Sequence, residues 1–149
     1  MEESVIMEEK QNVFRKVNTI LTGEDIAMLS PLQLAYIGDA VYELLVRTYI
    51  LDKNLQVNQL HRGATRYVKA GAQSDIVHDL DSILSDKERS IVKKGRNAKT
   101  NTSPKNADII EYKYATGFEA LFGYLYLNSE EDRIYELFQK IIEFQENKV

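Results

Sequence analysis

Apolar residues recur every three or four positions through most of this chain, which is the spacing of one face of a helix. The clearest stretch covers residues 30–51. Ser30 is a favoured residue before a helix, and Pro31 fits the first helical position, so this pair predicts where the helix begins. A polar break follows at 52–54. The pattern then predicts a second helix over about 58–80, loosened at Gly63 and at residues 70–72.

The second half of the chain shows the same periodicity. Ser85 predicts the cap of a short helix over 85–94, and a polar, basic loop is expected over 95–105. A long helix is predicted over 107–127. Ser129 with Asp132 resembles a capping arrangement for a last helix. No stretch alternates as strands do, so we predict an all-α fold.

The domain organisation follows from length and polarity. A chain of 149 residues is long enough to form one domain with a real core. Residues 1–22 are largely polar, so we expect a peripheral segment with a helical turn or two over 13–21. The domain itself is expected to cover residues 23–149.

The composition excludes several classes of protein. There is no cysteine, which excludes disulfides, thiolate metal sites and a cysteine nucleophile. The acidic first residues lack the basic and apolar regions of a signal peptide. No apolar run approaches the roughly 20 residues of a membrane span. We therefore expect a cytoplasmic protein.

Basic residues are concentrated, although the net charge is −4. Six of them lie between positions 89 and 105, where there are no acids: Arg89, Lys93, Lys94, Arg96, Lys99 and Lys105. A second cluster contains Arg62, Arg66 and Lys69. A local basic surface matters more to a polyanionic partner than the net charge does.

Two isolated carboxylates interrupt apolar helical stretches. Asp39 lies within Leu34–Val41, and Glu119 lies within Ala115–Gly123. A charge left unpaired among apolar side chains costs several kcal/mol. Each acid is therefore expected to meet a cation or to lie at the mouth of a site.

Glycines beside these acids suggest how the two carboxylates meet. Gly38, Gly117 and Gly123 each cost about 1 kcal/mol of helix propensity, and small residues in mid-helix are typical of close helix packing. Such packing would bring Asp39 and Glu119 together, and carboxylates are ligands that Mg²⁺ prefers. Alternatively, each acid pairs with a buried Arg or Lys, or lies at the surface.

The same segments resemble a known family. Leu34–Val41 is similar to the Gly-Asp signature of the ribonuclease III family, and Ala115–Leu127 is similar to that family's second acidic segment. More closely, the chain resembles the Mini-ribonuclease III subfamily, short bacterial proteins without a double-stranded-RNA-binding domain. The resemblance covers about residues 29–144. It also depends on His61, Arg66, Val68, Ala70, Gln73, Lys94–Lys99 and Pro104–Asn106.

This resemblance implies a ribonuclease III-type catalytic domain that is active as a homodimer. The implied reaction is Mg²⁺-dependent hydrolysis of phosphodiester bonds in double-stranded RNA, which leaves 5′-phosphate and 3′-hydroxyl ends. Asp39 and Glu119 are the implied catalytic and metal-binding residues. The implied substrate is the stem of precursor large-subunit (23S) ribosomal RNA, with a ribosomal protein as a candidate accessory partner.

RNA contacts are expected from basic and amide side chains, because phosphates and 2′-hydroxyls dominate the recognition of A-form duplexes. The candidates are Arg62, Arg66, Lys69, Lys93, Lys94, Arg96, Asn97, Lys99, Lys105 and Asn106. For the candidates in the basic segment that begins at Arg89, the alternative is a solvated basic loop without an RNA contact. Arg62, Arg66 and Lys69 alternatively pair with Asp75 or Asp79.

Other side chains are assigned to packing. His61 is interpreted as a capping or packing residue rather than a metal ligand. The tyrosines follow helical spacing, so we expect them in the core and on the dimer surface: Tyr36, Tyr42, Tyr49, Tyr112, Tyr114, Tyr124 and Tyr126.

Two positions depart from the wider family. An acid usually precedes the aspartate by four positions, where this chain has Ala35, and an aspartate usually precedes the glutamate by three, where it has Thr116. These losses favour a rival function, a non-catalytic module that binds structured RNA. A third interpretation is a helical protein–protein adaptor. Mg²⁺-dependent cutting of a simple duplex would distinguish them.

Overall fold

The computed structural model describes residues 12–99 and 108–148, and every regular element in that part is helical. This confirms the all-α prediction. Two elements are short 3₁₀ helices, η1 (Val13–Val17) and η2 (Asp81–Ile83). The α-helices are α2 (Gly23–Met28), α3 (Pro31–Ile50), α4 (Val57–Val68), α5 (Ala70–Leu80), α6 (Asp86–Asn97), α7 (Ile109–Leu127) and α8 (Glu131–Asn147).

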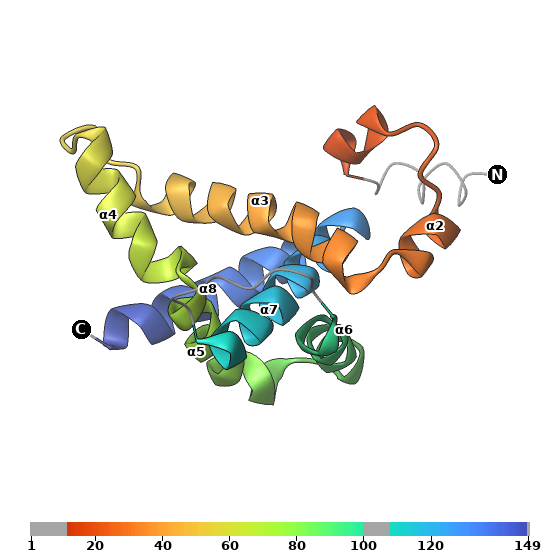
Figure 1. Cartoon of the computed structure of the whole chain (residues 1–149). Helices are drawn as coiled ribbons and strands as arrows, with labels where there is room; N and C mark the ends of the chain where they lie inside the picture. Colours follow the sequence, from red (N-terminus) through yellow and green to blue (C-terminus); the bar gives the residue numbers. More distant parts are fainter. Residues whose placement is uncertain (1–11, 100–107, 149) are drawn as a thin grey trace.

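Helix α7 is the centre of the fold, and α3, α5, α6 and α8 pack around it (Figure 1). It is apolar on most of its circumference, as expected of a helix that is covered on several sides. Phe118 and Phe122 are completely buried, and Tyr42 of α3 meets the Phe118 ring edge-on at 4.7 Å between centroids. None of the described helices has the length and hydropathy that crossing a membrane requires.

Local capping signals place several helix starts correctly. The Ser30 hydroxyl accepts a hydrogen bond from the Gln33 N–H, and Pro31 is the first residue of α3. The Ser85 hydroxyl likewise accepts from the Glu88 N–H at the start of α6. A similar capping box formed by Thr22 and Asp25 begins α2, a short helix that the periodicity did not predict.

Two predictions in the middle of the chain are wrong. The single helix predicted over 58–80 is two helices, because Lys69 is extended (φ −65°, ψ 152°) and separates α4 from α5. The helix predicted to end at Lys94 continues to Asn97. Gly95 does not end it, because this glycine lies against α7: a Cβ atom there would come within 2.6 Å of the Gly117 Cα.

The predicted cap of the last helix is also wrong. Ser129 has a positive φ of 59° and belongs to the turn between α7 and α8, and Glu130 is the residue before α8. The Ser129 hydroxyl instead accepts a hydrogen bond from the Asn12 N–H at 2.7 Å. The turn thereby anchors the start of the described chain.

Candidate active site

The crossing of α3 and α7 is built on two glycines. A Cβ atom at Gly38 would collide with the backbone oxygen of Glu119 and approach the Gly123 nitrogen to 2.6 Å. A Cβ atom at Gly123 would collide with the backbone oxygen of Leu34. The two backbones therefore touch where Asp39 and Glu119 are located, which is the close approach that the glycines predicted.

The two carboxylates interact across this crossing. Burial, followed by the negative charge of Asp39 and a hydrogen bond with it, raises the pKa of Glu119 to about 8. The side chain of Gln73 opposes this shift by hydrogen bonding to Glu119, and the charge of Glu43 adds to it. Glu119 is half-buried and Asp39 is exposed, so the pair opens to solvent.

The alternative pairing with a basic residue is absent from the described part of the chain. Within residues 12–99 and 108–148, no Lys or Arg forms an ion pair with Asp39 or Glu119. Glu43, one turn after Asp39, is bound to Arg47 at 2.7 Å. Two adjacent acids without a basic partner repel each other, and a bound cation would relieve that repulsion.

The donor set fits a hard divalent cation. Asp39 and Glu119 offer carboxylate oxygens, and the neighbouring Gln73 has a buried amide oxygen, Oε1, with no hydrogen-bond partner among the described residues. No group of three His, Cys, Asp or Glu side chains suited to a metal occurs in the described ranges. Water or substrate oxygens would have to complete the coordination of an ion held by this pair.

The two positions that depart from the wider signature point into the protein. Ala35 is buried in a second apolar cluster with Ile26 and Ile91. Thr116 is also buried, and its hydroxyl donates a hydrogen bond to the Tyr112 carbonyl at 3.0 Å. Neither position supplies a carboxylate to the pair.

Gln73 is a buried residue near the acidic pair, and the sequence indicated it only through the family resemblance. Its side chain is 2% exposed, although it is polar. A signal was present, because Gln73, Ile76, Val77 and Leu80 share the buried face of α5 at helical spacing. This spacing identifies the buried face of α5, but it does not indicate which helix covers that face.

Comparison with known proteins identifies the family. The sequence model of the ribonuclease III domain matches residues 32–130, which includes both acidic segments. The chain belongs to the ribonuclease III family. Among curated relatives, "Mini-ribonuclease 3" of Thermoanaerobacter is 49% identical over 92% of this chain and 99% of its own length, and that of Clostridium tetani is 47% identical over 84% of both. A crystal structure of a Fusobacterium nucleatum protein is 33% identical, covers 81% of this chain and 98% of its own, and has a TM-score of 0.73.

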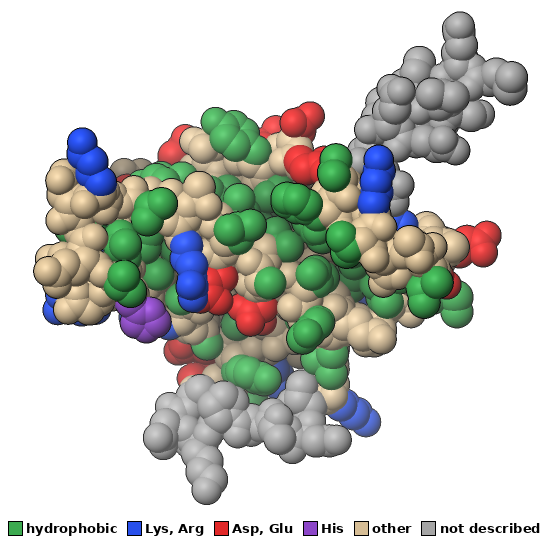
Figure 2. Space-filling model, turned by 90° about the horizontal axis from the view of Figure 1, so that it is seen from above, with side chains coloured by type: hydrophobic (Ala, Val, Ile, Leu, Met, Phe, Trp, Pro, Cys, Tyr) green, Lys and Arg blue, Asp and Glu red, His purple; other side chains and the backbone are tan. Residues whose placement is uncertain are grey.

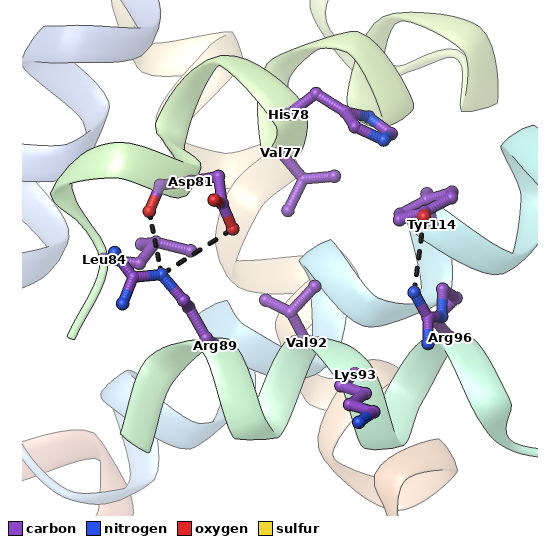
Figure 3. Close-up of a pocket in the computed structure, with 9 residues that line it drawn as sticks. All are labelled: Val77, His78, Asp81, Leu84, Arg89, Val92, Lys93, Arg96 and Tyr114. Carbon is purple, nitrogen blue, oxygen red and sulfur yellow. Dashed lines mark hydrogen bonds and ion pairs between the residues drawn. The ribbon is translucent and has the colours of Figure 1, made fainter. Parts of the chain in front are cut away.

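The basic residues of this ribonuclease III domain do not form one strip along α6. Lys93 and Arg96 line a pocket of about 580 Å³ between α5, α6 and α7, shown in Figure 3. Lys94 lines a different pocket, together with Lys87 and Tyr124. Lys99 is exposed beyond the end of α6. The predicted candidates Lys105 and Asn106 lie outside the described residues.

Arg96 is held in place by its neighbours. Its guanidinium donates to the Tyr114 hydroxyl at 3.3 Å and to the Asn97 side-chain oxygen at 3.1 Å. On the opposite wall of the pocket, the His78 ring lies 4.3 Å from the Tyr114 ring, centroid to centroid (Figure 3). Arg96 and Asn97 are therefore a fixed pair.

The second basic cluster, on α4 and just after it, contains both exposed residues and one that is bound to α8. Arg62 and Lys69 are exposed. Arg66 donates to the Gln145 carbonyl at 2.8 Å and lies 4.0 Å from Glu146, so its acidic neighbour is not Asp75 or Asp79. His61 is exposed and lines the groove between α3 and α4.

Proposed function

We propose that this chain is an endoribonuclease that hydrolyses phosphodiester bonds in double-stranded RNA, with Mg²⁺ held by Asp39 and Glu119. The observation that carries this proposal is the meeting of these two carboxylates at a crossing made of glycines. Membership of the ribonuclease III family supports the reaction type.

The arrangement suits an attack on a phosphodiester. Asp39 is exposed at the opening of the site, where substrate can reach it, and Glu119 lies half-buried behind it on the fixed core helix. When bound, Mg²⁺ supplies an activated water and neutralises charge on the phosphoryl oxygens. Hydrolysis then leaves a 5′-phosphate on one fragment and a 3′-hydroxyl on the other.

Binding of the duplex is proposed for the exposed basic residues. Lys93, Lys94 and Lys99 extend from α6 and its end, and Arg62 and Lys69 from the α4 region. Arg96 and Asn97 would contact RNA as a fixed pair, whereas Arg66 has structural partners of its own. Lys105 and Asn106 are proposed contacts from the sequence alone.

The exposed face of α3 supports a homodimer. Three apolar residues of α3 are spaced four or eight positions apart, so they lie on the same side of the helix. Leu32 is 39% exposed, Tyr36 is 84% exposed and Leu44 is 63% exposed. Figure 2, which looks down on α3, shows hydrophobic side chains over this face with acidic groups among them. An exposed apolar surface of this kind is typical of a protein interface. In such a dimer each of two sites would cut one strand.

The proposed substrate is the stem of precursor 23S ribosomal RNA in the cytoplasm, with a ribosomal protein as an accessory partner. The support is the similarity to relatives called Mini-ribonuclease 3. The described surface carries no signal for one particular stem.

A duplex cleavage assay tests the proposal. Purified protein is incubated with uniform double-stranded RNA, with Mg²⁺ or with EDTA. We expect Mg²⁺-dependent cutting by the wild type, none by Asp39→Asn or Glu119→Gln, and full activity of Asp132→Asn, an exposed control on α8. Undiminished cutting by Asp39→Asn would contradict the assignment.

A rival function has specific support. Because positions 35 and 116 are occupied by alanine and threonine, the pair has fewer carboxylates than the wider signature provides. A non-catalytic module that binds structured RNA would retain duplex binding but show no Mg²⁺-dependent cutting. The same assay therefore separates the two functions.

A further inference from the structure

The pocket of about 580 Å³ between α5, α6 and α7 is a site of its own (Figure 3). Its size falls within the range of small-molecule pockets, roughly 300–1,000 Å³. Buried Val77 and Leu84 and half-buried Val92 form its apolar part, and most of its other side chains are basic. Neither Asp39 nor Glu119 lines it. The pocket is therefore distinct from the acidic pair.

Positive charge exceeds negative charge in this pocket. Its single carboxylate, Asp81, lies 3.7 Å from the Arg89 guanidinium, which also pairs with Asp86 at 3.2 Å. The charge of Arg89 is thereby neutralised. Lys93 and Arg96 have no acidic partner in the part of the chain that the structure describes. These two uncompensated cations lie one turn apart on α6, which favours an anionic ligand.

The guanidinium of Arg96 is oriented before any ligand arrives. It donates to the Tyr114 hydroxyl at 3.3 Å and to the Asn97 side-chain oxygen at 3.1 Å, and its other N–H groups have no partner within the described ranges. A planar guanidinium can bind two oxygens of a phosphate at once. The Tyr114 hydroxyl, which accepts from Arg96, still has its own hydrogen to donate. These groups suit an anion.

The opposite wall of the pocket is the ring of His78, as Figure 3 shows. Its Nδ1 lies 2.7 Å from the Ser74 carbonyl oxygen, which can only accept, so Nδ1 carries the hydrogen. The ring also lies 4.3 Å from the Tyr114 ring, centroid to centroid. Both contacts fix the imidazole at the edge of the pocket, where it reports on a bound ligand.

We propose that this pocket binds a phosphate monoester, either the 5′-phosphate at the end of an RNA strand or that of a free nucleotide. A phosphate monoester carries about 1.5 to 2 negative charges near pH 7, which matches the two cations Lys93 and Arg96. A phosphodiester inside a strand carries one charge and is linked to the chain on both sides, so it matches the pocket less well. The inference does not depend on cleavage at the acidic pair.

Nuclear magnetic resonance titrations in EDTA test this proposal without any cutting. The probes are adenosine 5′-monophosphate, a single-stranded RNA trinucleotide with a 5′-phosphate, and the same trinucleotide with a 5′-hydroxyl. We expect the two phosphate-ended probes to bind saturably and to shift the His78 imidazole signals. The 5′-hydroxyl probe should bind about tenfold or more weakly, the scale of a lost charge-assisted hydrogen bond. Equal affinity of the two trinucleotides would overturn the inference.

The same titrations distinguish the two sources of the phosphate. If the phosphorylated trinucleotide binds more tightly than adenosine 5′-monophosphate, the ligand is the end of an RNA strand. If the mononucleotide binds as tightly or more tightly, the ligand is a free nucleotide. Absence of saturable binding by both probes would overturn the inference.

A matched control on α6 separates a specific site from general attraction to basic side chains. Lys87 is exposed like Lys93 but lines the pocket that contains Tyr124. Lys93→Gln and Lys87→Gln each remove one positive charge from the same helix. We expect Lys93→Gln to weaken binding of the phosphorylated probes by about tenfold. Lys87→Gln should stay within about twofold of the wild type. Equal weakening by both would overturn the inference.

Arg96→Gln tests the guanidinium and should also weaken binding by about tenfold or more. Thermal melts accompany it, because Arg96 also bonds to Tyr114. If it does not fold, Arg96→Lys replaces it, since lysine keeps the charge but cannot bind two oxygens side by side. Wild-type affinity of the folded variant would contradict the site. A protein that binds the phosphorylated probes but never cuts duplex RNA would reject the proposed function and leave this inference standing.

Discussion

The surroundings of Glu119 disfavour the charged form of its carboxyl group. Its carboxyl group is half-buried next to Asp39, and its pKa of about 8 keeps it largely protonated at neutral pH in the metal-free protein. A cation that binds here must therefore displace a proton. Metal binding should consequently strengthen as the pH rises toward 8.

The same environment predicts that Glu119→Gln stabilises the metal-free protein at alkaline pH. The folded-state pKa lies above the ordinary value of 4.5, so the folded protein holds this proton more tightly than the unfolded chain does. Stability is therefore lost as the pH rises from about 4.5 to 8. Glutamine removes this loss, with an expected gain on the order of 1–3 kcal/mol at pH 8 and none at pH 4.

Urea unfolding in EDTA at the two pH values measures this difference. Glu131→Gln, an exposed change at the start of α8, is the control and should follow the wild type. A Glu119→Gln variant with the same pH dependence as the wild type would show that Glu119 titrates normally.

At the scale of elements, glycines decide how closely the helices approach. Gly38 and Gly123 let α3 touch α7, and Gly95 and Gly117 do the same for α6 and α7. These glycines lower the helix propensity of their segments, and the close packing that they allow compensates for this loss. The same packing places Asp39 beside Glu119. The site is therefore a property of the crossing, not of either helix alone.

Gly38→Ala should disrupt that crossing. The added methyl group would meet backbone atoms of α7, which cannot move aside as a side chain can, so we expect a loss of about 3 kcal/mol or more and loss of cleavage. Gly63→Ala is the control, because the nearest atom to its Cβ, in the Ile50 side chain, is 3.8 Å away. It should stabilise α4 by about 0.5–1 kcal/mol. Equal melting temperatures for the two variants would contradict this account.

The sequence correctly predicted the features that depend on residues close to one another along the chain. The starts of α3 and α6 follow from Ser30 and Ser85, which cap their own helices. The glycines beside Asp39 indicated a close helix crossing. For the break at Lys69 the local signal was partial: the small residues at 70–72 indicated a loosened helix, but not that Lys69 is extended and separates α4 from α5. The burial of Gln73 depends on how α5 packs in the fold, and the sequence did not predict it.

At the scale of the whole molecule, acidic net charge coexists with separate basic surfaces. The net charge is −4, yet α6 and its end carry exposed lysines on more than one side. Affinity for a duplex should therefore depend strongly on salt.

Lys94→Ala combined with Lys99→Ala should weaken duplex binding at low salt and flatten its dependence on salt. Each lost phosphate contact reduces the slope of log K against log salt concentration by about 1. Binding is measured by fluorescence anisotropy in the Asp39→Asn background, which prevents cutting. Lys140→Ala on α8 should change neither quantity. An unchanged slope in the double variant would remove this end of α6 from the RNA surface.

Tyr36→Asp should dissociate the proposed dimer, because a charge in an apolar interface is costly to desolvate. Sedimentation velocity is expected to give a monomer for this variant and a dimer for the wild type. Val57→Asp, which changes another exposed apolar residue at the start of α4, should remain dimeric. A wild-type monomer at micromolar concentration would contradict the proposal.

One helix, α3, carries both Asp39 and the apolar stripe that includes Tyr36. The two residues are three positions apart, which is about 4.5 Å along a helix axis. In the proposed dimer, Asp39 of each subunit would therefore lie at a fixed distance from the dimer interface. The distance between the two active sites would then be set by the dimer interface. This distance would determine the stagger between the two cuts, and so the length of the overhang on each product, independently of the RNA sequence.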